Sequence, residues 1–443
     1  MRQFYKKMVV IAISFLSLFD SLFVRIQMGP LTITALRVIL LGLFLILLVK
    51  QVRAKKMLIS SSTYINCVLL FFIIWILYGL LQLTWATDKI SAVKQVYYLC
   101  LFFTLVYVML MTIDSMDIFV RLQQFIYGMG VWLIIFGIIE LNFGIHFPTS
   151  RIVIEPEIYH NVKRATAVFY NENDFSFYLV LISPMFLLNT FYKKGLYSKL
   201  VNMLFFVMLC YIVMANDSKF CMIALVVQIG ALLFRRDIIK RAKYPFILLG
   251  GGCTLLITFQ WSYLQSAYEL IKYQLSIGSG SAAIRKELLF KGLELLKNSY
   301  FLGVGPGNFE ENIHKITSGR GIDGIFNAHN WWMELLANYG LIVFLSYVIL
   351  FVFLVVHLKK IRKSGSETHS YYALYFFLSF IGFIFASASS SSIFYMWYQW
   401  LHFSLAVSFI NIYYEYANDD IVNKVLLSVT SVSIGSEPDV DSR

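Results

Sequence analysis

The stretch that decides the fold is a long polar segment, residues 263–339, which contains AAIRKE at 282–287, GVGPGNF at 303–309 and NAHNWW at 327–332. Apolar runs lie on both sides of it, so we interpret it as a loop outside a membrane. Loops this long are uncommon unless they carry a function. We therefore expect any chemistry of this protein to reside here.

The composition excludes an ordinary soluble protein. The 443 residues are 59% hydrophobic and 14% charged, whereas a soluble domain has about 25% charged residues. The net charge of +12 does not indicate a nucleic-acid partner, because the basic residues cluster between apolar runs, as in the cytoplasmic loops of membrane proteins. All five cysteines lie in apolar runs, which excludes a disulfide-stapled outer domain and a cysteine nucleophile in 263–339.

Twelve apolar runs approach the length of about 20 residues that a helix needs to span a bilayer. They cover 8–24, 31–49, 64–84, 96–113, 120–142, 175–192, 199–215, 220–234, 244–262, 340–357, 371–389 and 393–413. The N-terminus has no small-residue cleavage site, so we interpret its apolar run as a retained span and not as a signal peptide. The predicted fold is an all-α polytopic membrane protein with about 12 transmembrane helices.

Basic residues follow the even-numbered runs, which predicts that both termini are cytoplasmic. The clusters are Lys50, Arg53, Lys55 and Lys56; Lys193, Lys194 and Lys199; Arg235, Arg236, Lys240, Arg241 and Lys243; and Lys359, Lys360, Arg362 and Lys363. The predicted parts are 1–262 with nine helices and an outer loop at 144–174, the large extracytoplasmic loop 263–339, three helices in 340–413, and a cytoplasmic tail 414–443 that begins with a short interfacial helix around 421–427.

Apolar residues recur at helical spacing around Arg285 and predict an amphipathic helix on the outer membrane surface. They are Ile284, Leu288, Leu289, Leu293 and Leu296. Arg285 in the first turn has two interpretations. It is either a headgroup anchor or solvated charge, or a guanidinium that binds a phosphate, for which arginine is better suited than lysine.

His329 stands where Asn327 or Asn330 can cap a helix that Gly340 ends. The positive end of a helix favours a neutral imidazole, which suits a general base. The alternative is a histidine that is merely hydrogen-bonded at a membrane interface. The glycine run around Gly305 predicts a turn, or backbone amides that approach an anionic ligand.

Further cations lie in or beside the other predicted outer loops. Arg164 opens RATAVFYNENDF at 164–175, and Lys219 begins the eighth run. Arg37 lies inside the second run, where a charge is costly and indicates function unless it snorkels to the surface. The one clear Asp-x-Asp pair, at 439 and 441, is in the tail, so a metal-dependent, nucleotide-sugar site is not indicated. Outer cations instead suit a lipid-linked pyrophosphate donor.

In combination these motifs resemble the O-antigen ligase and polymerase superfamily of bacterial envelope glycan assembly. The resemblance covers about 160–350 and rests on Arg285 in its amphipathic helix, LGVGPGNF at 302–309, AHN at 328–330 with Gly340, VFYNENDF at 168–175, and Ser218-Lys219 where members commonly have Ser-Arg.

The resemblance implies a C-type membrane glycosyltransferase in the bacterial plasma membrane that needs no metal or cofactor. It implies an undecaprenyl-pyrophosphate-linked glycan donor, a glycan acceptor, membrane lipid, and flippase and chain-length regulator proteins as candidate partners. Arg164 and Arg285 would hold the pyrophosphate, with Lys219 supporting them although it lacks the bidentate fork of arginine. His329 would activate the acceptor for an inverting displacement, and Asn330 and Gly305 are further candidates for substrate binding.

Three functions remain open. The first is a polymerase of polysaccharide repeat units, for capsule, exopolysaccharide, O-antigen or a teichuronic-acid-like polymer. The second is an O-antigen ligase that transfers finished glycan to lipid A core or another acceptor. The third is a glycan flippase or other transporter, which would place polar residues near the midplane and commonly shows repeats; we see neither pattern in this sequence.

Overall fold

The computed structural model describes residues 2–23, 25–29, 31–54, 63–159, 163–233, 281–317, 326–388 and 393–433, with a few isolated positions between 265 and 276. The ninth predicted span, the basic residues 235–243 and the Asp439/Asp441 pair lie outside the described residues.

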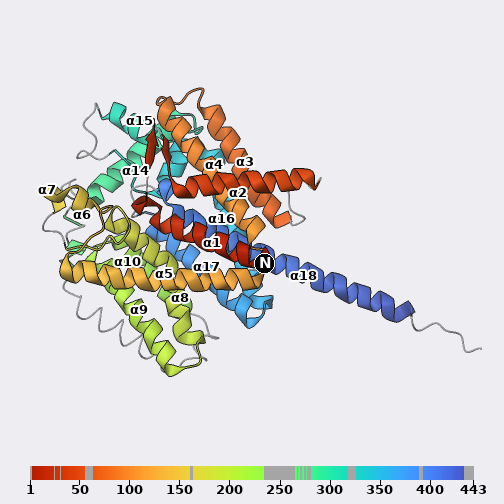
Figure 1. Ribbon diagram of the computed structural model, residues 1–443. Coiled ribbons are helices and arrows are strands. Elements are labelled where there is room, and N and C mark those ends of the chain that lie inside the picture. Colours follow the sequence, from red (N-terminus) through yellow and green to blue (C-terminus); the bar gives the residue numbers. More distant parts are fainter. Residues whose placement is uncertain are drawn as a thin grey trace, which may run out of the picture.

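The described chain is almost entirely helical (Figure 1). Its first half contains α1 (Arg2–Phe19), η1 (Asp20–Leu22), β1 (Ile26–Met28), β2 (Leu31–Ile33), α2 (Ala35–Arg53), α3 (Thr63–Gln82), α4 (Lys89–Thr112), α5 (Met116–Phe143), α6 (Arg151–Ile154), α7 (Pro156–Tyr159), α8 (Glu172–Tyr192), α9 (Leu196–Ala215) and α10 (Lys219–Leu233). Its second half contains α14 (Ser281–Asn298), α15 (Phe309–Ile316), α16 (Trp331–Ser364), α17 (Glu367–Ala386), η2 (Ile393–Tyr395) and α18 (Trp397–Ser433).

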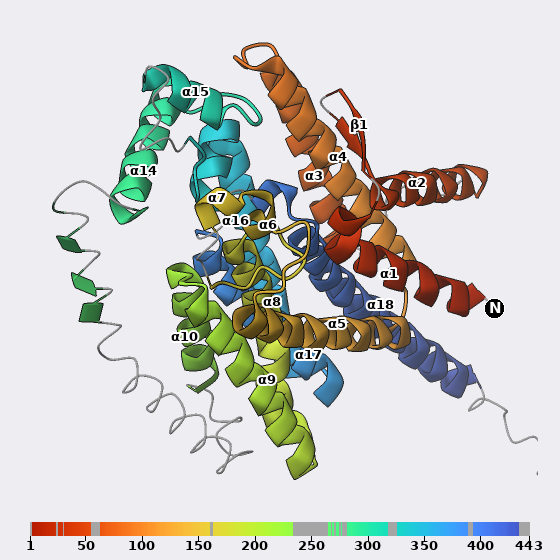
Figure 2. The ribbon, with the colours of Figure 1, turned by 60° about the vertical axis from the view of Figure 1, so that its left-hand side comes forward.

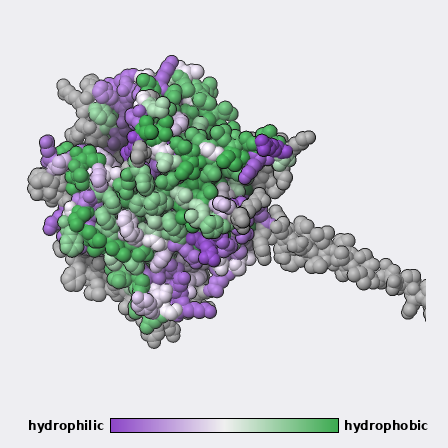
Figure 3. Space-filling model, in the orientation of Figure 1, coloured by the Kyte–Doolittle hydropathy of each residue, from purple (hydrophilic) through white to green (hydrophobic). Residues whose placement is uncertain are grey.

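Eight of the described helices are long and apolar enough to cross a membrane, namely α2, α3, α4, α5, α8, α9, α16 and α17. Broad hydrophobic areas cover the face of the molecule in Figure 3, and large apolar side chains of α2 and α16 such as Leu45 and Ile349 are exposed. Lipid is the solvent that accommodates such a surface. The chain is therefore an all-α polytopic membrane protein in its architecture; the predicted spans 1, 8 and 12 correspond to α1, α10 and α18, which fall outside that set of eight.

The core of the bundle is built around α8, whose residues are almost all buried between α9, α10 and α17. The same core extends to α3, α4, α16 and α18, which are joined through aromatic rings. Phe102 stacks on Trp400 with ring centroids 4.5 Å apart, and Trp75 meets Tyr339 edge-on at 5.3 Å. Aromatic pairs of this kind add to the stabilisation from buried area.

One end of the bundle collects the connections that matter for function. Tyr78 at the end of α3 donates to the Leu302 carbonyl at 2.8 Å, and the Asp88 amide before α4 donates to Asn308 at 2.6 Å. Asn216, after α9, donates to the Ala165 carbonyl at 2.9 Å. Figure 2 accordingly shows α14 and α15 beside the start of α16, on the side of the α3–α4 turn. The opposite end carries the basic N-terminus, where Lys7 pairs with Asp117 at 2.5 Å.

The structure corrects several local predictions. A β-hairpin, β1 and β2 with Ile26 opposite Ile33, stands where only a loop and the start of a span were expected. The tail helix predicted around 421–427 is continuous with α18, which runs to Ser433. The tenth predicted span agrees with the structure, since α16 consists of two helices on either side of Gly340, whose φ of +76° is not helical; the first is the short helix predicted to end at Gly340, and the second is the span predicted from 340.

The predicted amphipathic helix exists as α14, but two residues of the predicted apolar face point elsewhere. Ile284, Leu288 and Leu296 are buried, whereas Leu289 and Leu293 are exposed. The buried side packs on α16 through Gly292, where an added Cβ would meet the Met333 sulfur at 2.4 Å. A helix expected to rest on lipid alone is therefore anchored to protein along one side.

Candidate functional site

A small cavity of about 80 Å³ brings together three of the predicted site residues, Arg285, His329 and Asn330. They come from the first turns of α14 and from the residues that lead into α16. The other lining residues are Phe220 of α10, Leu289, Ala328, Met333 and Ala388. Lys219 directly precedes Phe220, so a fourth predicted residue lies next to the cavity.

Local backbone structure fixes the position of His329. Asn330 caps α16, since its side chain accepts hydrogen bonds from the Trp332 and Met333 amides at 3.0 and 3.3 Å. The Trp331 amide donates to the Ser387 carbonyl at 3.1 Å, which docks this helix start on the end of α17. His329 itself has φ +43°, a left-handed conformation that few residues other than glycine adopt. Asn330 thus acts first as a cap, as predicted.

The electrostatics around His329 favour the neutral imidazole. Burial lowers its pKa to about 4, and the positive charges of Arg285 and Arg151 act in the same direction. Its Nδ1 is buried and has no hydrogen-bond partner among the described residues. A neutral ring with an unused nitrogen can accept a proton or hydrogen-bond a ligand hydroxyl. The sequence predicted a neutral histidine from the helix dipole, but burial and arginine charges are the causes in the structure.

Arg285 has the environment expected of a residue that binds an anion. Its guanidinium lies over the Phe220 ring, 5.2 Å from the centroid, and burial lowers its pKa. The described part of the chain gives it no carboxylate partner. A half-buried guanidinium without a counter-charge is suited to an anionic ligand.

Arg164 shares a buried carboxylate with a second arginine that the sequence analysis missed. Arg164 Nη1 donates to Glu172 Oε1 at 2.5 Å, and Arg151 at the start of α6 pairs with the same oxygen. Glu172 is the first residue of α8 and only 1% exposed. Two arginines therefore share one carboxylate oxygen. The sequence could have indicated Arg151 as a candidate, since it is a further arginine in the loop predicted to face outward.

Buried polar residues hold this loop in place. Glu140, near the end of α5, accepts hydrogen bonds from the Thr166 and Ala167 amides at 2.8 and 2.6 Å, and His146 lies 2.9 Å from its other oxygen. Asn216, in the α9–α10 turn, accepts a hydrogen bond from the Ala165 amide and donates one to the Ala165 carbonyl. Glu140 was also missed, although an ionisable residue inside a predicted span is itself a signal.

Lys219 and Gly305 occupy different kinds of position. Lys219 is the first residue of α10, 3.9 Å from Asp217 and beside the cavity. Gly305 does not line it: its amide donates to the Asn338 carbonyl at 3.0 Å, and an added Cβ would meet Ala86 at 2.8 Å. The glycine run thus packs the loop against α16 and the α3–α4 turn, which corresponds to the turn interpretation.

Fold and site define the class of the protein: a multi-pass membrane protein with a neutral histidine and several cations at one end of the bundle. Residues 204–348 match the family described as O-Antigen ligase. The chain is also 24% identical over 310 residues to "Teichuronic acid biosynthesis protein TuaE" of Bacillus subtilis (strain 168), covering 68% of this chain and 63% of that relative. The resemblance to the O-antigen ligase and polymerase superfamily is thereby confirmed.

Proposed function

We propose that the protein is a membrane glycosyltransferase of envelope polysaccharide biosynthesis. The observation that carries the proposal is one cavity that contains both His329, with its pKa lowered to about 4, and Arg285, which has no carboxylate partner among the described residues. Both residues lie inside the part of the chain that matches the O-antigen ligase family. Arg151, whose charge lowers the pKa of His329, and Arg164, which shares Glu172 with Arg151, lie outside that part.

The proposed reaction is a single inverting displacement. His329 accepts the proton of an acceptor hydroxyl, whose oxygen attacks the anomeric carbon of the donor sugar, and the bond to the carrier pyrophosphate breaks. Arg285 binds the leaving pyrophosphate and stabilises the charge that develops on it. Arg151, Arg164 and Lys219 add positive charge beside it. Every group in this scheme belongs to the chain, so the proposal includes neither a metal nor a cofactor.

Among such enzymes we propose a polymerase that takes repeat units from an undecaprenyl-pyrophosphate carrier. The relative's printed name concerns teichuronic acid biosynthesis, which among the candidate functions favours the polymerase of a teichuronic-acid-like product over the O-antigen ligase. We place the site on the outer side of the membrane and both termini in the cytoplasm. The basic N-terminus and Lys359, Lys360 and Lys363 of α16 lie at the end of the bundle opposite the site, as this orientation requires.

A transporter fits the structure less well. Transporters commonly bind their substrate near the midplane, on interrupted helices. Here the histidine and the cations lie at helix ends or in the connections between helices.

The test is transfer by the purified protein in lipid discs, supplied with a synthetic lipid-linked repeat unit. We expect polymer from the wild type, and a loss of about a hundredfold or more in His329→Ala, as for removal of a general base. Arg285→Ala should lose turnover and Arg285→Lys recover part of it. Lys291→Ala on the exposed side of α14 is the matched control and should retain activity. Full activity of both His329→Ala and Arg285→Ala at equal protein levels would refute the proposal.

A further inference from the structure

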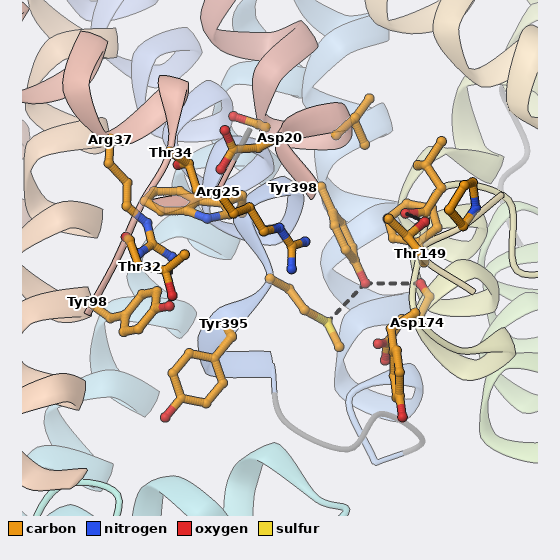
Figure 4. Close-up of a pocket in the computed structure, with 18 of the residues that line it drawn as sticks. Asp20, Arg25, Thr32, Thr34, Arg37, Tyr98, Thr149, Asp174, Tyr395 and Tyr398 are labelled. Carbon is orange, nitrogen blue, oxygen red and sulfur yellow. Dashed lines mark hydrogen bonds between the residues drawn. The ribbon is translucent and has the colours of Figure 1, made fainter. Parts of the chain in front are cut away.

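A second and larger cavity, of about 500 Å³, lies beside the β-hairpin at the same end of the bundle. Its walls come from η1, the hairpin, the start of α2, the loop 148–174 and residues 395–398. Figure 4 shows the polar groups that face it, including Arg25, Arg37, Thr32, Tyr98 and Tyr395. This volume lies within the range of about 300–1,000 Å³ that is typical of sites for small ligands.

Arg37 is the residue whose environment most strongly indicates a bound anion. It is 6% exposed, its Nη2 donates to Tyr98 Oη at 2.7 Å, its Nη1 donates to the Thr32 carbonyl, and its guanidinium lies 4.8 Å from the Tyr98 ring centroid. Its Nε has no partner among the described residues, and none of the ion pairs found in them involves it. It therefore neither reaches lipid headgroups as a snorkelling residue would nor neutralises an acid.

The position of Arg37 in α2 increases the cost of its charge. It is the third residue of the helix, where the backbone dipole repels a cation and attracts an anion. A buried guanidinium with neutral partners at the positive end of a helix is unfavourable unless an anion joins it. Arg25, which directly precedes β1, extends into the same cavity as a second cation (Figure 4).

Two carboxylates also line the cavity, and both are engaged elsewhere. Asp20 accepts the Leu36 amide at the start of α2 at 3.2 Å. Asp174 lies in the first turn of α8, where the dipole favours it, and its carboxylate accepts from Asn171 at 2.9 Å. Neither pairs with Arg25 or Arg37 in the described structure. The arginines therefore retain their capacity to bind an anion.

The remaining lining is of the kind that holds a sugar. Aromatic rings of Tyr98, Tyr395, Trp397 and Tyr398 provide apolar faces against which the C–H faces of a pyranose can pack. Hydroxyl groups add hydrogen-bonding capacity: Thr34 Oγ1 is buried with no partner among the described residues. A ligand that combines an anionic group with a sugar ring would satisfy the arginines, the threonine and the rings together.

The large cavity and the His329 cavity are connected through shared segments of the chain. The loop 148–174 contributes Thr149 and Tyr170 to the large cavity, and the same loop supplies Arg151, whose charge lowers the pKa of His329. Tyr395, which lines the large cavity, is in turn affected by the charge of Glu334, one turn into the helix that His329 precedes.

We propose that this second cavity is a subsite for the acceptor glycan, in which Arg37 and Arg25 bind the carboxylate of an acidic sugar. The assignment to the acceptor rests on the proposed glycosyltransferase function, whereas binding of the acidic sugar does not. Arg37 and Arg25 act here as specificity-determining residues that select acidic over neutral glycans.

The test measures binding and not turnover, so that it stands apart from the catalytic proposal. The full-length protein in phosphatidylcholine discs is titrated with a tetrasaccharide of alternating glucuronic acid and N-acetylglucosamine, and with its carboxyl-reduced neutral form. We expect the acidic form to bind about tenfold or more tightly, as for a charge-assisted pair. Arg37→Gln should remove this preference, and Arg25→Gln should weaken it. Arg121→Gln on α5, which pairs with Asp117 at the far end, is the control.

The results of this binding test either support or overturn the acidic-sugar subsite. Arg25 is exposed, so its variant reports even if the buried Arg37→Gln fails to fold. Equal affinity for the two tetrasaccharides, or a preference that survives both substitutions, would overturn the proposal. Phosphatidylglycerol in the discs that displaces the acidic tetrasaccharide through Arg37 would assign the cavity to a lipid headgroup instead. We expect His329→Ala to bind the acidic tetrasaccharide as the wild type does. The binding result can therefore be interpreted even if the catalytic proposal fails.

Discussion

At the scale of single residues, charge is distributed so that the site stays cationic while its histidine stays neutral. Glu172 partly offsets Arg151 and Arg164, and Arg285 has no such partner in the described structure. The pKa of His329 is lowered to about 4 from the ordinary value of 6.5. A pyrophosphate bound at Arg285 would act in the opposite direction, because negative charge favours the imidazolium.

This balance predicts a pH dependence. In the free protein His329 is neutral above a pH of about 4 and becomes protonated as the pH falls through that value. The acidic limb of kcat/KM should therefore lie near this pKa, and that of kcat at higher pH, since the latter reports the complex with the anionic donor. Arg285→Gln removes one cause of the shift and should raise the His329 pKa. NMR of ring-labelled histidine, assigned with His329→Ala, measures it; an unchanged or lower pKa in Arg285→Gln would contradict the account.

A second residue-scale prediction concerns Glu140, whose carboxylate accepts the amides of Thr166 and Ala167. Both amides donate to the same oxygen of Glu140, so Glu140→Gln keeps an acceptor there but replaces two charge-assisted hydrogen bonds by neutral ones, at a cost of about 1–3 kcal/mol. Thermal unfolding in detergent should show a lowered midpoint. Glu157→Gln, on the exposed surface of α7, is the matched control and should unfold as the wild type does. Equal midpoints for all three proteins would show that this carboxylate does not hold the loop.

At the scale of elements, the sequence predicted what local pattern determines. Apolar runs located the eight described helices that are long and apolar enough to cross a membrane, and Asn330 and Gly340 marked the start and the break of α16. Contacts between distant segments left no such local signal. The shared use of Glu172 by Arg151 and Arg164 depends on how a loop folds over α8, and the packing of α14 depends on the shape of α16. The hairpin was missed because its strands are three residues each, too short for an alternating pattern.

The glycine motif gives a prediction at this scale. Gly303 has φ +86°, and an added Cβ would lie 2.5 Å from the Asn338 carbonyl oxygen and the Gly340 amide nitrogen. Gly303→Ala should therefore force the loop away from the break in α16, beyond the cost of about 1–3 kcal/mol for the strained backbone alone. Gly42→Ala in α2, where nothing lies within 4 Å, is the matched control. Equal thermal midpoints of the two variants in lipid discs would refute this role.

At the scale of the whole molecule, the decisive question is which end of the bundle faces outward. The two cavities, α14 and α15 share one end, while the lysines near the N-terminus and Lys359, Lys360 and Lys363 lie at the other. The positive-inside rule then predicts that the cavities face away from the cytoplasm. In a cysteine-free background of intact cells, Lys297→Cys on α14 should react with a membrane-impermeant maleimide, and Lys363→Cys should react only after permeabilisation. Both positions are exposed, so accessibility within the fold does not bias the comparison. The reverse pattern would put the histidine and arginines in the cytoplasm, where a carrier-linked glycan presented on the outer face could not reach them. It would remove the basis for the proposed function and for assigning the second cavity to the acceptor.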